Sequence, residues 1–185
     1  MPHAAIGRTS LTLLTVASLA VACSSRGEEG TVGAPSDGGS ADTSTTTPPP
    51  EKRCGPGANA YSAVYTQADI ARLAGCTVYV GRLQEDSVEA LADFSGLESL
   101  RTIEGTLNVF RSPGFVTMKG LENLETVDGD LFIHMNPNLR SITEMRSLRL
   151  VTGRLEIFSN GALPIEQARA FAESITVRGA KRIEP

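Results

Sequence analysis

Three consecutive stretches of the chain align without a gap: LESLRTIEGTLNVFRSPGFVTMKG (97–120), LENLETVDGDLFIHMNPNLRSITE (121–144) and MRSLRLVTGRLEIFSNGALPI (145–165). They repeat with a period of 24 residues, and apolar residues fall in the same columns of each stretch. A fixed period in this range with apolar columns in register predicts a solenoid, in which each repeat packs on its neighbours. The columns hold Leu97, Leu121 and Met145; Leu100, Leu124 and Leu148; Ile103, Val127 and Val151; Leu107, Leu131 and Leu155; and Val109, Ile133 and Ile157.

Each repeat predicts two short parallel strands with a glycine between them. Polar and apolar residues alternate in GDLFIHM (129–135), so Leu131 and Ile133 should point inward while Phe132 and His134 point outward. The glycine marks a bend that other residues tolerate poorly. The sequence therefore predicts a mainly β solenoid of about four 24-residue turns. The other strands centre on Ile103, Val127 and Val151, and the bends fall at Gly81, Gly105, Gly129 and Gly153.

Short polar residues mark the next corner of each repeat. Ser112, Asn136 and Asn160 occupy the same position in successive repeats. Backbone groups in a buried corner need hydrogen-bond partners, which Ser and Asn side chains supply. We therefore expect these side chains to turn inward and to hydrogen-bond along a ladder.

Two helices are expected to cap the ends of the stack, as solenoids require. Thr66 and Asp69 resemble a capping box, so a short helix should begin near Gln67. At the other end Pro164 suits the first position of a helix, and a last strand is expected over 175–177. This C-terminal helix has one apolar stripe, made of Ile165, Ala168, Phe171, Ala172 and Ile175.

The N-terminus predicts export and a lipid anchor. Residues 11–22 are apolar but too short to span a bilayer, which is typical of a signal peptide over residues 1–22. The following LAVAC (19–23) resembles a bacterial lipobox, so Cys23 is the expected lipidation site; ordinary cleavage that leaves Cys23 free is the alternative. Ser24 resembles the residue that directs lipoproteins to the outer membrane. Residues 23–53 are rich in Gly, Ser, Thr and Pro, and predict a disordered tether.

The three cysteines of the chain fit this exported context. Lipidation of Cys23 leaves Cys54 and Cys76 as a pair, and an oxidising compartment permits a disulfide between them. A metal site at this pair would need further Cys or His ligands nearby, which the sequence lacks. We therefore expect a disulfide that holds the N-terminal end of the stack.

The repeat resembles the receptor L domain, the ligand-binding lobe of the insulin and EGF receptors, which also occurs in bacterial and fungal surface proteins. The resemblance covers Cys54–Leu163 and rests on Cys54–Pro56, on GCTVYVGRL (75–83), on the repeated core and on NPNLRSI (136–142). It implies a right-handed parallel β-helix, a Cys54–Cys76 disulfide and no catalysis. Later turns lack the additional cysteines of the receptors, so hormone-contact residues do not transfer. The leucine-rich repeat family is the alternative assignment for this repeat.

The solenoid register brings aromatic residues together on one sheet face. Side chains one turn apart would lie about 4.8 Å from each other. A contiguous exposed apolar patch usually marks an interaction surface, whereas cross-strand Phe contacts also stabilise a sheet by themselves. Alternatively, residues 61–65 fold over this face. The outward columns are Asp86, Phe110, His134 and Phe158, and beside them Gln84, Asn108, Phe132 and Glu156; the candidate binding face is Phe110, Phe132, His134, Phe158, Asn108 and Glu156.

Catalytic and metal roles find little support in the sequence. His134 has only Glu156 and Asp130 as nearby candidate ligands, and it lacks the convergent nucleophile that triad chemistry needs. Glu104, Asp128 and Asp130 are the carboxylates that a polysaccharide-cleaving β-helix could use, but Thr152 interrupts their column. No cofactor and no metal are expected.

These observations predict a non-catalytic lipoprotein, anchored in the bacterial cell envelope by its N-terminal lipid. Its solenoid domain, residues 54–178 followed by a 179–185 tail, would bind a protein or glycan ligand. A nucleic-acid partner is not supported, because the net charge is −4 and the charges are mixed in sign along the chain. A polysaccharide-cleaving enzyme and a purely structural envelope scaffold are the alternatives.

Overall fold

The computed structural model describes residues 50–58, 60–86 and 91–185. All of them belong to one compact unit, Thr46–Pro185. The predicted signal peptide, the lipidation site Cys23 and nearly all of the predicted tether lie outside the described residues. Neither helix in the described part of the chain is long and apolar enough to cross a membrane.

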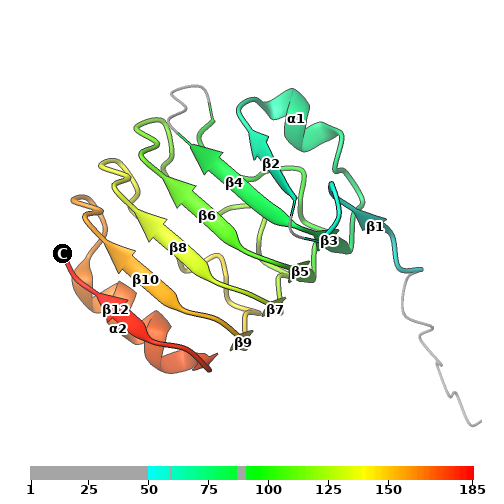
Figure 1. Ribbon diagram of the computed structural model, residues 1–185. Helices are drawn as coiled ribbons and strands as arrows, with labels where there is room; N and C mark the ends of the chain where they lie inside the picture. The colour runs from blue at the N-terminus through cyan, green and yellow to red at the C-terminus, as the bar shows by residue number, and fades with distance from the viewer. Residues whose placement is uncertain (1–49, 59, 87–90) are drawn as a thin grey trace, which may run out of the picture. The chain divides into compact units, whose positions relative to one another are not determined.

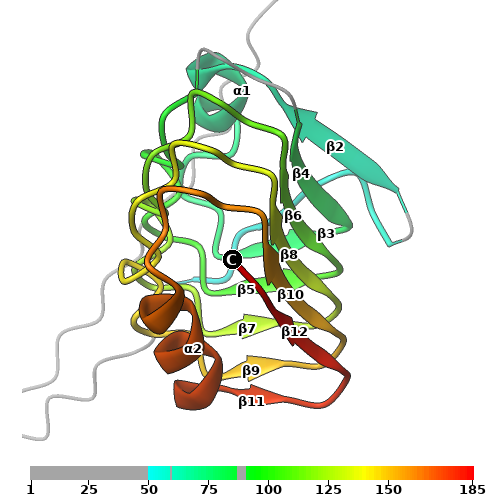
Figure 2. The same ribbon diagram turned by 90° about the vertical axis from the view of Figure 1, so that its left-hand side faces the viewer.

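The chain forms two parallel sheets and alternates between them (Figures 1 and 2). This arrangement confirms a mainly β fold with the character of a solenoid. The first sheet has the order β1-β3-β5-β7-β9-β11, and its strands are Arg53–Cys54, Val78–Val80, Thr102–Glu104, Thr126–Val127, Leu150–Val151 and Thr176–Val177. The second sheet has the order β12-β10-β8-β6-β4-β2, and its strands are Lys181–Ile183, Leu155–Phe158, Leu131–His134, Leu107–Phe110, Arg82–Asp86 and Tyr61–Val64.

The repeat of the sequence is also the register of both sheets. In the first sheet Ile103 pairs with Val127, and in the second sheet Leu107 pairs with Leu131. Each apolar column is therefore a continuous row of neighbours, and it is buried because both sheets turn it toward the same core. The core is completed by Phe94 and Phe115, whose rings pack edge to face with centroids 5.0 Å apart.

The glycine column confirms a bend, and close approach between repeats explains the need for glycine. A Cβ atom at Gly105 would lie 2.1 Å from the carbonyl oxygen of Gly81, and one at Gly129 would lie 2.3 Å from that of Gly105. Such contacts are far inside van der Waals distance. Gly105 also has a φ of +146°, where side chains are rarely accommodated.

The opposite corner is also built the same way in each repeat. Arg111, Met135 and Ser159 have φ values of +55°, +62° and +55°, a left-handed conformation that non-glycine residues seldom adopt. Each is followed by a buried polar residue. The left-handed residue thus directs the next side chain inward. Those inward residues are Ser112, Asn136 and Asn160.

These three residues form the predicted ladder. The Asn136 side-chain oxygen accepts a hydrogen bond from the Ser112 N–H at 3.1 Å, and the Asn160 oxygen accepts one from the Asn136 N–H at 3.1 Å. Their amide nitrogens donate to the carbonyls of Val109 and Ile133. The ladder therefore satisfies backbone groups of neighbouring repeats.

The ladder ends at Glu85, a buried carboxylate that was not predicted from the sequence. Glu85 lies in the inward column of the second sheet, where its strand neighbour is Val109, and it is fully buried. The Ser112 hydroxyl donates a hydrogen bond to its carboxylate. A buried carboxylate is stable only when it is hydrogen-bonded, and the polar ladder provides such a place.

At the N-terminal end, the helix α1 (Gln67–Ala71) and the disulfide are as predicted. Thr66 is the N-cap of α1, and both hydrogen bonds of its capping box with Asp69 are present. Cys54 and Cys76 form a disulfide, with their Cα atoms 6.0 Å apart. It ties β1 to the residues just before β3.

At the C-terminal end, α2 (Ile165–Ser174) follows Pro164, which is the N-cap and not the first helical residue as predicted. The predicted last strand is present as β11. The predicted 179–185 tail needs a correction, because Lys181–Ile183 form β12 and pair with β10. Lys181 and Arg182 are exposed while Ile183 packs against the core, so an edge strand resembled a polar tail in the sequence.

Candidate functional site

The strand register gathers the predicted binding residues on the outer face of the second sheet. Asn108, Phe132 and Glu156 are paired in one column across β6, β8 and β10. Phe110, His134 and Phe158 form the neighbouring column. All six side chains are half-buried and alternate with buried residues of the core. We call these six residues the aromatic face.

His134 is the centre of the aromatic face. Its ring centroid lies 4.8 Å from that of Phe110, 4.8 Å from that of Phe158 and 5.9 Å from that of Phe132. The His134 and Phe158 rings are stacked with only 16° between their planes, whereas Phe132 meets His134 edge to face. These contacts fix the rings relative to one another before any ligand arrives.

Three arginines lie over the phenylalanine rings, and sequence reasoning missed them. The guanidinium carbon of Arg182 is 4.2 Å from the centroid of Phe158, a cation–π distance. Arg182 was hidden because it was assigned to the tail. Arg154 follows Asp130 by one period, so the repeat itself offered a signal for their ion pair at 3.0 Å. The other two distances are 5.0 Å from Arg154 to Phe132 and 5.5 Å from Arg111 to Phe110.

A shallow open depression of about 410 Å³ lies beside the aromatic rings. One alternative from the sequence was that residues 61–65 fold over this face. Instead, β2 pairs with β4 and extends the same sheet, so it leaves β6, β8 and β10 uncovered. The depression is lined by Arg82, Gln84, Asn108, Phe110, Phe132, His134 and Glu156.

Burial decides the charge state of His134. Removal of the imidazole from water lowers its pKa below 6.5; Glu156 opposes this shift and Arg182 adds to it. His134 is therefore neutral at pH 7. Its Nδ1 atom and the Oδ1 atom of Asn108 are buried and have no hydrogen-bond partner among the described residues.

The ion pairs around the face shift pKa values in the expected directions. Burial raises the pKa of Asp130, but hydrogen bonds from the backbone and the guanidinium of Arg154 outweigh it, so the net shift is downward. Hydrogen bonding to Asp130 raises the pKa of Arg154, and hydrogen bonding to Glu184 raises that of Arg182. All these groups are charged at neutral pH.

Residues 75–176, more than half of the 185-residue chain, match the family model of the receptor L domain. The chain belongs to the receptor L domain family. No curated protein matches it significantly. Membership of a family of ligand-binding domains supports a ligand-binding role in general terms, and it names no ligand.

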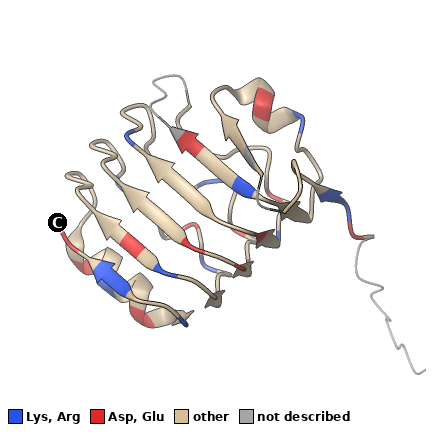
Figure 3. Ribbon diagram, in the orientation of Figure 1, with Lys and Arg blue, Asp and Glu red and all other residues tan. Residues whose placement is uncertain are grey.

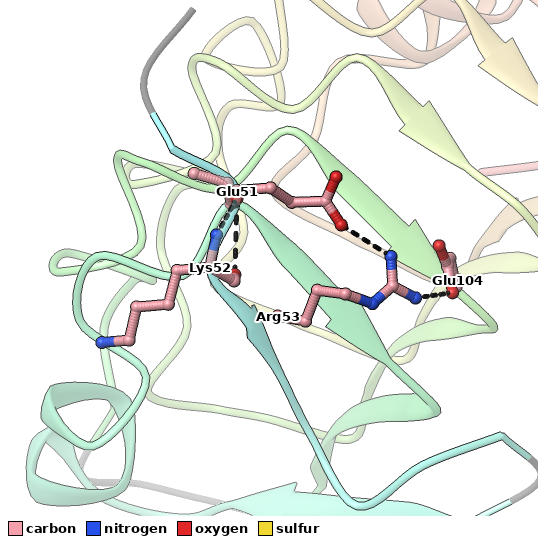
Figure 4. Close-up of polar contacts among 5 residues, drawn as sticks. Glu51, Lys52, Arg53 and Glu104 are labelled. Atoms are coloured by element: carbon pink, nitrogen blue, oxygen red, sulfur yellow. Dashed lines mark hydrogen bonds and ion pairs between the residues drawn. The ribbon is translucent and has the colours of Figure 1, made fainter.

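Of the three carboxylates considered for catalysis in this L domain, Asp130 pairs with Arg154 beside the aromatic face, whereas Glu104 and Asp128 have other partners. Glu104 forms an ion pair with Arg53, which also pairs with Glu51 at 2.8 Å (Figure 4). Asp128 accepts a hydrogen bond from the Thr152 hydroxyl at 2.9 Å. Within the described residues, no group of three or more His, Cys, Asp or Glu side chains is placed to hold a metal ion.

Proposed function

We propose that this L domain is a non-catalytic binding module that presents its aromatic face to a protein or glycan ligand. The observation that carries this proposal is the register of β6, β8 and β10, which gathers three phenylalanines around His134. A contiguous half-exposed apolar cluster on a surface is typical of an interaction site.

The distribution of charge supports the same surface. β6 and β8 carry no Lys, Arg, Asp or Glu, whereas charged residues flank them on β4, β10 and β12 (Figure 3). An apolar, aromatic centre with a polar rim is the usual anatomy of a protein interface. Because the rings already pack against one another, ligand binding would cost little side-chain entropy.

The proposal includes export and a lipid anchor at Cys23, in the bacterial envelope and with the outer membrane as its destination. The N-terminal sequence pattern supports it, and the disulfide is compatible with an oxidising compartment. The part of the predicted 23–53 tether before Lys52 would give the domain reach from the membrane, whereas Lys52 and Arg53 are already bonded to the first sheet. We further propose that α1 and α2 cap a right-handed stack of about four 24-residue turns. Mass spectrometry of the mature N-terminus should show a lipidated Cys23, and an unmodified cysteine would contradict the anchor.

A capture experiment with matched variants tests the binding surface. Thr126 lies on the outer face of the first sheet, is also half-buried and serves as the control position. Envelope extract is passed over the wild-type domain, Phe132→Asp and Thr126→Asp, and bound material is compared by mass spectrometry. We expect the same specific ligand on wild type and Thr126→Asp, and its loss on Phe132→Asp. Equal capture by all three proteins would show that the aromatic face is not the binding surface.

A further inference from the structure

We infer that the ligand of the aromatic face is an acidic protein surface, recognised by guanidinium groups that the phenylalanine rings hold in place. This inference rests on the proposed binding function and adds the chemistry of the partner. It is based on two features of the second sheet: the ring faces already contact other groups of the domain, and guanidinium groups lie over them.

The flat faces of the rings are largely occupied within the domain. His134 stacks on Phe158 at 4.8 Å, close to the spacing of neighbouring strands, so these rings are stacked along the sheet from strand to strand. Arg182 lies over Phe158, and Arg154 lies over Phe132. A ligand approaching the sheet therefore meets ring edges and guanidinium groups. Ring edges carry the positive end of the aromatic quadrupole.

This arrangement disfavours a glycan. A sugar ring is bound by aromatic residues through the flat face of the aromatic ring, and here His134 and Phe158 stack on each other while guanidinium groups lie over Phe132 and Phe158. Protein interfaces, in contrast, are enriched in aromatic and arginine side chains together, and binding energy concentrates on such residues.

Two arginines beside the aromatic face lack an ion-pair partner in the described part of the chain. Within the described residues, Arg82 and Arg111 form no ion pair, although Arg82 lines the depression and Arg111 lies over Phe110. The chain as a whole is negative, at −4.

The two arginines that do have partners can exchange them. Arg154 pairs with Asp130 and Glu156, and Arg182 pairs with Glu184, with the arginine side chains 53 % and 51 % exposed. The Arg182–Glu184 pair is exposed on both side chains, and such a pair contributes little to stability. A carboxylate on the partner can replace Glu184 at small cost, and the planar guanidinium, fixed over a ring, can bind it with two hydrogen bonds.

The test uses a defined probe, a phage-displayed library of random twelve-residue peptides selected against the full chain. We expect enriched peptides to combine aspartate or glutamate with apolar residues. The affinity of an enriched peptide, measured by fluorescence anisotropy, should fall at least tenfold in Arg154→Glu and in Arg182→Glu. The matched control is Arg169→Glu on α2, because Arg169 is 54 % exposed and paired with Glu166, and we expect less than a twofold change there.

Two further measurements keep the inference open to refutation if a variant folds poorly. Affinity of the wild-type chain should fall as salt is raised, and Arg154→Lys, which keeps the charge but not the planar group, should bind with intermediate affinity. Enrichment of neutral or basic peptides would overturn the inference. So would loss of binding in Phe132→Asp with full binding in both Glu variants, a result that leaves the proposed function standing. Peptide binding that survives all of these changes would refute both the inference and the proposed function. Binding of neutral glycans alone on a glycan array would refute the acidic partner.

Discussion

The two sheets of this domain share one repeat but differ on their outer faces. The outer face of the first sheet carries Thr102, Thr126 and Leu150 in one column, and its charged residues pair locally, as Arg53 does with Glu104. The outer face of the second sheet carries aromatic rings overlaid by arginines. Both sheets bury equivalent apolar columns on the inside.

This difference separates the residues that make the fold from those that make the surface. The inner columns, the glycine bend and the Asn ladder are needed for the repeats to stack, so they recur with the period. The outer columns are free of that requirement, because a Thr or a Phe is compatible with the same strand. The proposed binding function accounts for the aromatic face, whose cross-strand ring contacts also stabilise the sheet.

The largest expected effect is the loss of an inner-column side chain, and it should be alike in both sheets. Leu131 of the second sheet and Ile103 of the first sheet are fully buried. Truncation of either residue to Ala should lower the free energy of unfolding by about 2–5 kcal/mol, because it removes apolar contacts and leaves a cavity. Chemical denaturation measures this loss of unfolding free energy. A loss below about 1 kcal/mol in only one sheet would contradict a shared core.

The disulfide should have the next largest effect. Its cysteines are separated by 22 positions, and closing a loop of this length should stabilise the folded state by about 3 kcal/mol. We expect Cys54→Ser/Cys76→Ser, and the wild type under reducing conditions, to lose about this much in denaturant unfolding. If reductant leaves the unfolding curve of the wild type unchanged, this estimate is wrong.

Loss of a ladder asparagine should destabilise the domain more than loss of an exposed asparagine at the same corner. Asn136→Ala leaves the buried Ser112 N–H and Val109 carbonyl without their side-chain partner and should lower the free energy of unfolding by about 1–3 kcal/mol. Asn138 bonds the Pro113 carbonyl at the surface, and Asn138→Ala should lose no more than about 0.5 kcal/mol. Equal losses in the two variants would rule out the ladder as a specific stabilising element.

The smallest expected effect is a pH dependence of stability that comes from His134 in the second sheet. The pKa of His134 is lowered in the folded state, so between that pKa and 6.5 the unfolded state binds more protons and stability rises with pH. Stability should therefore fall as pH drops below 6.5, until the folded pKa is passed. His134→Phe should remove this part of the dependence in melting-temperature measurements at pH 5 and 7. An unchanged pH profile in that variant would assign the effect to other groups.

Much of the fold and of the candidate site followed from the period. A period of 24 sets the register, and the register places Phe110, His134 and Phe158 in one column without any knowledge of long-range contacts. The arginines were less predictable, because a long side chain reaches over a neighbouring strand and its position depends on local geometry. Glu85 was missed because it occupies an apolar column, and its hydrogen bond with Ser112 depends on a contact between residues 27 positions apart.

The most direct test of the central claim is hydroxyl-radical footprinting of the domain with and without the ligand recovered by capture. The method reports both outer faces in one sample. We predict that oxidation of Phe132 and Phe158 falls several-fold when the ligand is bound, while oxidation of Leu150 on the first sheet is unchanged. Protection of Leu150 without protection of either phenylalanine would contradict the account.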